Sequence, residues 1–122
     1  MAEARKRTGD LGEKLARQYL ARNGYEILEQ NYRCSIGEID IVARDGNSLT
    51  FVEVRTKRSK QFGTPEESVT PAKQAKLIEL AQTYLQKHEI TSEDWRIDVV
   101  AVELKKDKQV SRIELIKNAV GE

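Results

Sequence analysis

Two stretches of the chain repeat their hydrophobic positions at the spacing of an α-helix. The first runs from Leu11 to Leu20, and Asn23-Gly24 after it favours the end of a helix. The second runs from Pro71 to about Lys87, and Thr70 before it is a typical N-cap residue. Residues 1–8 precede the first helix as a basic lead-in, which we expect to be mobile.

The other apolar positions alternate with a period of two, as in β-strands. Two such runs flank Asp45-Gly46-Asn47-Ser48, a turn sequence, and therefore predict a β-hairpin. In the run at 96–103 the side chains expected on either face of the strand are mostly apolar, which indicates a strand in the centre of a sheet. Because a helix links the third and fourth strands, we expect a right-handed crossover and one parallel pair. The expected strands lie at 25–33, 36–44, 49–55, 96–103 and 110–116.

Length and composition limit the architecture to one core. A chain of 122 residues with 39% apolar and 34% charged residues suits a single α/β domain over residues 1–122. The expected element order is αβββαββ, a mixed central sheet flanked by helices. The single cysteine excludes an intramolecular disulfide. No apolar run approaches the roughly 20 residues that span a bilayer, so we expect a cytoplasmic protein without a membrane partner.

The hairpin brings acidic residues together. If Arg44 faces Leu49 across the turn, then Asp40 faces Glu53 on the neighbouring strand. Two carboxylates whose Cβ atoms lie about 5 Å apart normally destabilise a sheet. The arrangement is more natural where Arg55 or a divalent cation neutralises it, and two carboxylates with water are ligands that Mg²⁺ takes from proteins.

An ordinary sheet with one solvated face is the competing interpretation of the same alternation. Strand periodicity predicts that one face carries Glu38, Asp40, Phe51, Glu53 and Arg55. The opposite set, which should pack inward, is Ile39, Ile41, Val52 and Val54. Both interpretations remain open on spacing alone.

Two segments of the hairpin resemble the YraN-like family of small, uncharacterised bacterial proteins. They read GEIDIVARDG at 37–46 and FVEVRTK at 51–57, and GEKLA at 12–16 and DVVAV at 98–102 fit as well. The family looks like a branch of the PD-(D/E)XK nuclease superfamily. The resemblance therefore implies a restriction-endonuclease-like core. It also implies a DNA endonuclease or Holliday-junction-resolvase-like nuclease that uses Mg²⁺ or Mn²⁺.

The resemblance assigns roles to individual residues. Asp40 and Glu53 would be the metal ligands, and Glu13 would complete the catalytic site from the first helix. Arg55 stands where the superfamily usually has lysine. Because arginine stays charged, Arg55 is excluded as a general base, but it could bind the phosphate. Glu13 has a structural alternative, a capping box with Asp10.

A basic cluster extends from the hairpin into the next loop and helix. Its members Arg55, Lys57, Arg58, Lys60 and Lys73 would contact a phosphate backbone, although charge runs are usually solvated faces. Lys57, two residues further on the same alternation, is also a candidate to replace the missing lysine. The resemblance suggests that Gln74 contacts nucleic acid, with a hydrogen bond to the backbone as its structural alternative.

Three functions follow from these observations. The first is a metal-dependent nuclease whose partner is nucleic acid, DNA in the first place. The second is a nucleic-acid-binding module of the same fold without cleavage, and the third is a structural or interaction domain. The net charge of +1 means that nucleic-acid binding needs a local basic patch. A homodimer is an option for a nuclease, since two strands need two sites.

Overall fold

A computed structural model describes residues 2–58, 63–91 and 94–121, and its elements follow the expected order. The order is helix, three strands, helix, two strands, with a short 3₁₀ helix before the second helix. The elements are α1 (Ala2–Arg22), β1 (Glu26–Cys34), β2 (Gly37–Asp45), β3 (Ser48–Lys57), η1 (Glu66–Ser68), α2 (Pro71–Lys87), β4 (Asp94–Leu104) and β5 (Val110–Val120).

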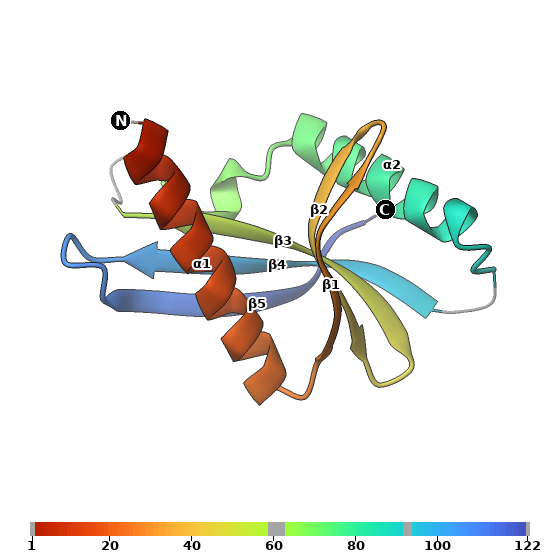
Figure 1. Ribbon diagram of the computed structural model, residues 1–122, viewed down its shortest axis with the longest axis horizontal. Helices are drawn as coiled ribbons and strands as arrows, with labels where there is room; N and C mark the ends of the chain where they lie inside the picture. Colours follow the sequence, from red (N-terminus) through yellow and green to blue (C-terminus); the bar gives the residue numbers. More distant parts are fainter. Residues whose placement is uncertain (1, 59–62, 92–93, 122) are drawn as a thin grey trace.

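One sheet holds the five strands in the order β1-β2-β3-β4-β5. The pair β3–β4 is parallel and the other pairs are antiparallel, which confirms the mixed sheet and the crossover through α2. α1 crosses one side of the sheet and α2 lies against the other (Figure 1). The fold is therefore a single α/β domain with a restriction-endonuclease-like core.

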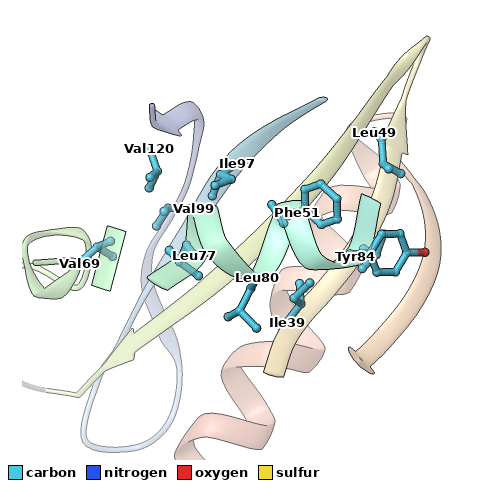
Figure 2. Close-up of a cluster of buried hydrophobic side chains, with 12 residues drawn as sticks. Ile39, Leu49, Phe51, Val69, Leu77, Leu80, Tyr84, Ile97, Val99 and Val120 are labelled. Atoms are coloured by element: carbon cyan, nitrogen blue, oxygen red, sulfur yellow. The ribbon is translucent and has the colours of Figure 1, made fainter. Parts of the chain in front are cut away.

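Each helix buries its own face of the sheet. The consecutive β4 residues Val99 and Val100 belong to different cores, because neighbouring strand residues point to opposite faces. On the α2 side, Leu77, Leu80 and Tyr84 pack toward the sheet (Figure 2). The buried sheet residues that they meet are Ile39, Val42, Leu49, Phe51, Ile97 and Val99. The α1 side is built on Ala16, Leu20, Tyr25, Ile41, Ala43, Val52, Val100, Val102 and Leu104.

Local signals place the helix boundaries well for α2 and less well for α1. The hydroxyl of Thr70 accepts a hydrogen bond from the backbone N–H of Lys73, as an N-cap does, and Pro71 occupies the first turn. α1 begins at Ala2, earlier than its apolar spacing indicates, so the basic lead-in is part of the helix. Among the described residues, no helix is long and apolar enough to cross a membrane.

The β2–β3 hairpin has the predicted register but not the predicted faces. Arg44 faces Leu49, and a further pair, Asp45–Ser48, leaves a two-residue turn. The paired positions run as far as Ile41–Val52. Ile39, however, packs in the α2 core and Ile41 in the α1 core, so the strict alternation predicted for them is wrong. Between Ile39 and Ile41 the β1–β2 ladder skips Asp40 and Asn31, and Asn31 has a left-handed φ of 51°, so the sheet is locally irregular at this point.

The solvated-face interpretation is also wrong. Helices cover both faces of the sheet at this hairpin, so Phe51 and Glu53 are not on an open surface, whereas the Glu38 side chain is still 37% exposed. Phe51 is 3% exposed and Glu53 is 4% exposed. Glu53 therefore lies in the protein interior, where an uncompensated carboxylate is costly.

Candidate functional site

The candidate site lies where β2 and β3 diverge. Beyond the Ile41–Val52 pair the two strands separate, β2 rising toward α2 while β3 continues along β4 (Figure 1). At this fork the side chain of Asp40 replaces a strand hydrogen bond, because its Oδ2 accepts from the backbone N–H of Val54 at 2.8 Å. The irregular strand thus turns the Asp40 carboxyl toward β3.

Asp40 meets a second carboxyl at the fork. Burial raises the pKa of Asp40 to about 8, and the negative charges of Glu53 and Glu13 act in the same direction. A hydrogen bond between the side chains of Asp40 and Glu53 contributes further. The predicted juxtaposition of Asp40 and Glu53 is therefore present, although it is made by the side chains and not by a backbone pair.

Two cations face Glu53. Its Oε2 lies 3.5 Å from Nη1 of Arg55 and 3.4 Å from Nζ of Lys73, at the N-terminal end of α2. Nη2 of Arg55 also donates to the backbone carbonyl of Ser68 at 3.1 Å. Among the described side chains, Nε of Arg55 is buried without a hydrogen-bond partner. The sequence predicted Lys73 as a contact to nucleic acid, whereas here it also compensates Glu53.

Glu13 approaches the fork from α1. Gly12 makes this approach possible, because a Cβ there would lie 1.8 Å from Oγ1 of Thr56 on β3. Burial raises the pKa of Glu13, and the charge of Glu38 adds to the shift. α1 is already helical at Asp10, so Asp10 and Glu13 do not form the capping box considered from the sequence.

Asn31 is a site residue that the sequence reasoning missed. It lies on β1 between the pairs Gln30–Ile41 and Tyr32–Ile39, beside the irregular position of Asp40. In the orientation that satisfies its neighbours, its amide nitrogen donates to Oε1 of Glu13 and to Oε1 of Glu38, at 2.9 Å each. Its φ of 51° is left-handed, a conformation that asparagine tolerates better than most residues. The sequence feature that could have identified this position is an asparagine within a run of residues that favours a strand.

A cleft opens beside these groups, between the first half of α1, the end of β3 and η1. Its volume is about 460 Å³. It brings together four of the residues predicted from the sequence, Glu13, Arg55, Lys57 and Arg58. The other lining residues are Thr8, Gly9, Val54, Thr56 and Ser68. The cleft therefore combines cationic side chains with the carboxyl of Glu13.

Residues 12–102 match the model of the uncharacterised protein family UPF0102. The chain belongs to this family. It is 52% identical over 122 residues to a UPF0102 protein of Dehalococcoides mccartyi, an alignment that covers 100% of this chain and 99% of the relative. A UPF0102 protein of Syntrophus aciditrophicus is 52% identical over 113 residues, covering 93% of this chain and 87% of the relative. One of Moorella thermoacetica is 48% identical over 119 residues, covering 98% and 99%. The resemblance to the YraN-like family is confirmed.

The other residues of this UPF0102 chain that were predicted to contact nucleic acid either make hydrogen bonds within the protein or lie outside the described residues. Gln74 donates from Nε2 to the backbone carbonyl of Val69 at 3.1 Å, which is its structural alternative. Nζ of Lys57 donates to the carbonyl of Gly63 at 3.5 Å. Nη2 of Arg58 donates to the carbonyl of Lys106 at 3.0 Å. Lys60 lies outside the described residues.

The donor set at the fork suits a hard divalent cation. Asp40 and Glu53 supply oxygen atoms, and a cation between them would relieve the repulsion that raises the pKa of Asp40. The described residues contain no cluster of three or more His, Cys, Asp or Glu side chains arranged to hold a metal. The UPF0102 fork thus offers two carboxylates, the number that Mg²⁺ commonly takes from a protein, with water completing its coordination.

Proposed function

We propose that this UPF0102 protein binds nucleic acid, DNA in the first place, and cleaves its phosphodiester backbone with Mg²⁺ or Mn²⁺. The observation that carries the proposal is the pair Asp40–Glu53 at the fork. One of its carboxyls is nearly fully buried, and the other has a pKa of about 8. A buried carboxyl with a strongly raised pKa beside a second carboxyl is typical of a functional site.

Asp40 and Glu53 would hold the metal ion. When bound, the ion would supply Lewis acidity at a phosphate oxygen and lower the pKa of a water molecule. Asp40 must lose its proton before it can serve as a charged ligand, so metal affinity should rise with pH up to about 8. Glu13 and Asn31 would orient the acidic side of the site, through the hydrogen bond that joins them.

Arg55 would bind the phosphate. It lines the cleft, where its side chain is 32% exposed, so its guanidinium can donate to an anionic oxygen there. Its permanent charge suits the stabilisation of negative charge that develops on the phosphate, but excludes proton transfer. Lys57 lines the same cleft, two residues further along β3. It is the lysine that could act beside the metal.

A nucleic-acid-binding module without cleavage is the second candidate. It is favoured by the two cations on Glu53, since Arg55 and Lys73 already compensate this carboxylate without a metal. In that case the cleft would bind the backbone and no bond would break. Either activity would be exercised in the cytoplasm, where we place the protein, and a homodimer would suit cleavage of both strands.

A cleavage assay tests the proposal. Supercoiled plasmid and a labelled four-way junction are incubated with the protein in Mg²⁺, Mn²⁺ or EDTA. Asp40→Asn and Glu53→Gln are the test variants, and Glu79→Gln, an exposed carboxylate on α2, is the matched control. We expect cleavage in Mg²⁺ or Mn²⁺ by the parent and by Glu79→Gln. Loss of one metal ligand should reduce it by on the order of a hundredfold, comparable to the loss of an electrostatic contact in other active sites.

Binding to the same substrates in Ca²⁺ separates the alternatives. Salt-dependent binding without cleavage in any metal would reject the nuclease and leave the binding module. A labelled RNA hairpin is added as a further substrate, and absence of binding to the DNA substrates and to this RNA at low salt would reject both and leave a structural or interaction domain.

A further inference from the structure

A second pocket adjoins the cleft on the far side of Lys57 and Arg58. Its volume is about 280 Å³, and it shares these two residues with the cleft. The rest of its lining comes from β4 and β5 and the turn between them, including Lys105 and Lys106. We call it the hairpin pocket. It was not part of the site predicted from the sequence.

The sheet topology creates this pocket. The parallel pairing of β3 with β4 puts Lys57 beside Glu103, so the C-terminal ends of both strands lie at one edge. The guanidinium of Arg58 then donates to the carbonyl of Lys106, a residue 48 positions away in sequence, at 3.0 Å. This bond fixes the β4–β5 hairpin against the end of β3.

The tip of the hairpin directs positive charge outward. Backbone bonds from Lys105 N–H to the Gln109 carbonyl (2.7 Å) and from Lys108 N–H to the Lys105 carbonyl (2.9 Å) close the turn. The carboxylate of Asp107 accepts from the Gln109 N–H at 3.1 Å and so caps the turn. Lys105 and Lys106 are exposed.

The acidic residue in the pocket is already compensated. Glu103 is 5% exposed, and its carboxylate accepts a hydrogen bond from Nε of Arg112. The lining of the hairpin pocket thus carries four cationic side chains, Lys57, Arg58, Lys105 and Lys106, and one carboxylate that is already paired with Arg112. Arg58 uses Nη2 for the Lys106 carbonyl, and a guanidinium has five N–H donors in total, so it retains donors for an anion.

We propose that Lys105 and Lys106 of the β4–β5 hairpin, together with Lys57 and Arg58, form a second phosphate-binding surface that holds the nucleic-acid backbone beside the cleft. The inference rests on the proposed function, because it extends the same basic track. In this arrangement the β4–β5 hairpin would position the nucleic-acid strand, and the residues at the fork would act on the scissile phosphate. A backbone with regularly spaced phosphates fits two adjoining basic pockets better than a single small anion does.

A salt titration of binding tests this surface. Affinity for a labelled DNA duplex and a four-way junction is measured in Ca²⁺ for the parent, Lys105→Ala/Lys106→Ala and Lys105→Arg/Lys106→Arg. The matched control is Arg22→Ala/Lys87→Ala, which removes two exposed charges from the last turns of the helices. Loss of two phosphate contacts should flatten the slope of log affinity against log salt by about 2 and weaken binding at low salt on the order of tenfold or more.

The arginine variant should keep the parent's slope, since it preserves both charges, and the helix-end control should change little. If the alanine variant behaves like the helix-end control while the parent binds DNA, the hairpin surface is rejected and the proposed function stands. If the parent does not bind nucleic acid at all, both are rejected. Inorganic phosphate that competes as strongly as DNA would also overturn the proposal, because it would identify a site for a small anion.

Discussion

Two aspartates interrupt the sheet in the same way, but their electrostatic surroundings are opposite. Asp40 lies at the fork of β2 and β3, and Asp98 lies at an irregularity of the β4–β5 ladder. Each accepts a backbone N–H of the neighbouring strand at 2.8 Å, Asp40 from Val54 and Asp98 from Asn118. A left-handed asparagine accompanies each aspartate, Asn31 at φ 51° and Asn118 at φ 52°.

Asp98 is surrounded by donors. It is fully buried, and its oxygens accept from the hydroxyl of Tyr25 at 2.8 Å and from Nε of Arg96 at 2.9 Å. Arg96 is paired in turn with Asp45 at 2.6 Å. Asp40 instead faces Glu53 and is repelled by Glu13. The same irregular backbone thus builds a saturated structural network at Asp98 and a strained carboxylate pair at the fork.

Neutralisation of Asp98 should have the largest effect on stability. Asp98→Asn removes one of the two carboxylates that compensate Arg96, the buried one, and leaves a mismatched network of hydrogen bonds around the amide. We expect a loss of about 3 kcal/mol or more in the free energy of unfolding. Urea denaturation measures it, and an unchanged m-value would show that the denatured state is unaffected. A loss below about 0.5 kcal/mol, the range of surface substitutions, would contradict the structural role.

The stabilisation by a divalent cation should be the next largest difference between variants at the two aspartates. Saturating Mn²⁺ at a hundred times its Kd should stabilise the parent by about 2.7 kcal/mol, because the ion binds only the folded state. Asp40→Asn should gain less, since it lacks one charged ligand, whereas Asp98→Asn should gain as much as the parent. Thermal melts in EDTA and in Mn²⁺ provide the comparison. Equal melting temperatures of the parent in the two conditions would reject the metal site.

The pH dependence gives a finer distinction. The pKa of Asp40 in the folded state, about 8, is above its ordinary value of 3.8, so the folded protein holds a proton that the unfolded chain lacks. In EDTA this contribution to stability is complete below pH 4 and is lost as the pH rises toward 8, by at most about 1.4 kcal/mol per pH unit. Asp40→Asn should flatten the slope and be at least as stable as the parent at pH 8.

The network of Asp98 should respond in the opposite direction. The hydrogen bond from Arg96 lowers the pKa of Asp45, so the stability from Asp45 is present above its ordinary pKa and is lost as the pH falls below it. Denaturation midpoints measured between pH 3 and pH 9 test both signs. A parent that becomes more stable from pH 5 to pH 8 in EDTA would contradict the assignment at Asp40.

Local sequence signals predicted most of the fold. The N-cap at Thr70 and the turn at Gly46-Asn47 depend on side chains next to the backbone that they shape, so they are readable from a few residues. The hairpin register followed from the turn, and the parallel pair followed from the length of the crossover. These features also indicated that Asp40 and Glu53 lie close together, although their side chains meet without the backbone pair that the register predicts.

The rest of the site depends on contacts between distant segments. The irregularity at Asp40 has no marker in a period-two pattern, so Ile39 and Ile41 were wrongly placed on one face. The pairing of Lys73 with Glu53 requires the docked position of α2, and the bond from Arg58 to Lys106 requires the parallel register of β3 and β4. Such contacts follow from the assembled sheet, not from spacing along the chain.

The strands lie in the sheet in chain order, and this order has a consequence for folding. The hairpins β1–β2, β2–β3 and β4–β5 form through contacts close in sequence, whereas β3–β4 requires closure of the long segment that contains α2. Asp40 and Glu53 belong to a local hairpin, but Lys73 belongs to the crossover. We therefore expect the two carboxylates to meet while they are still in water. Docking of α2 would then bury Glu53 and add Lys73 to Arg55, the cation that β3 already places beside it.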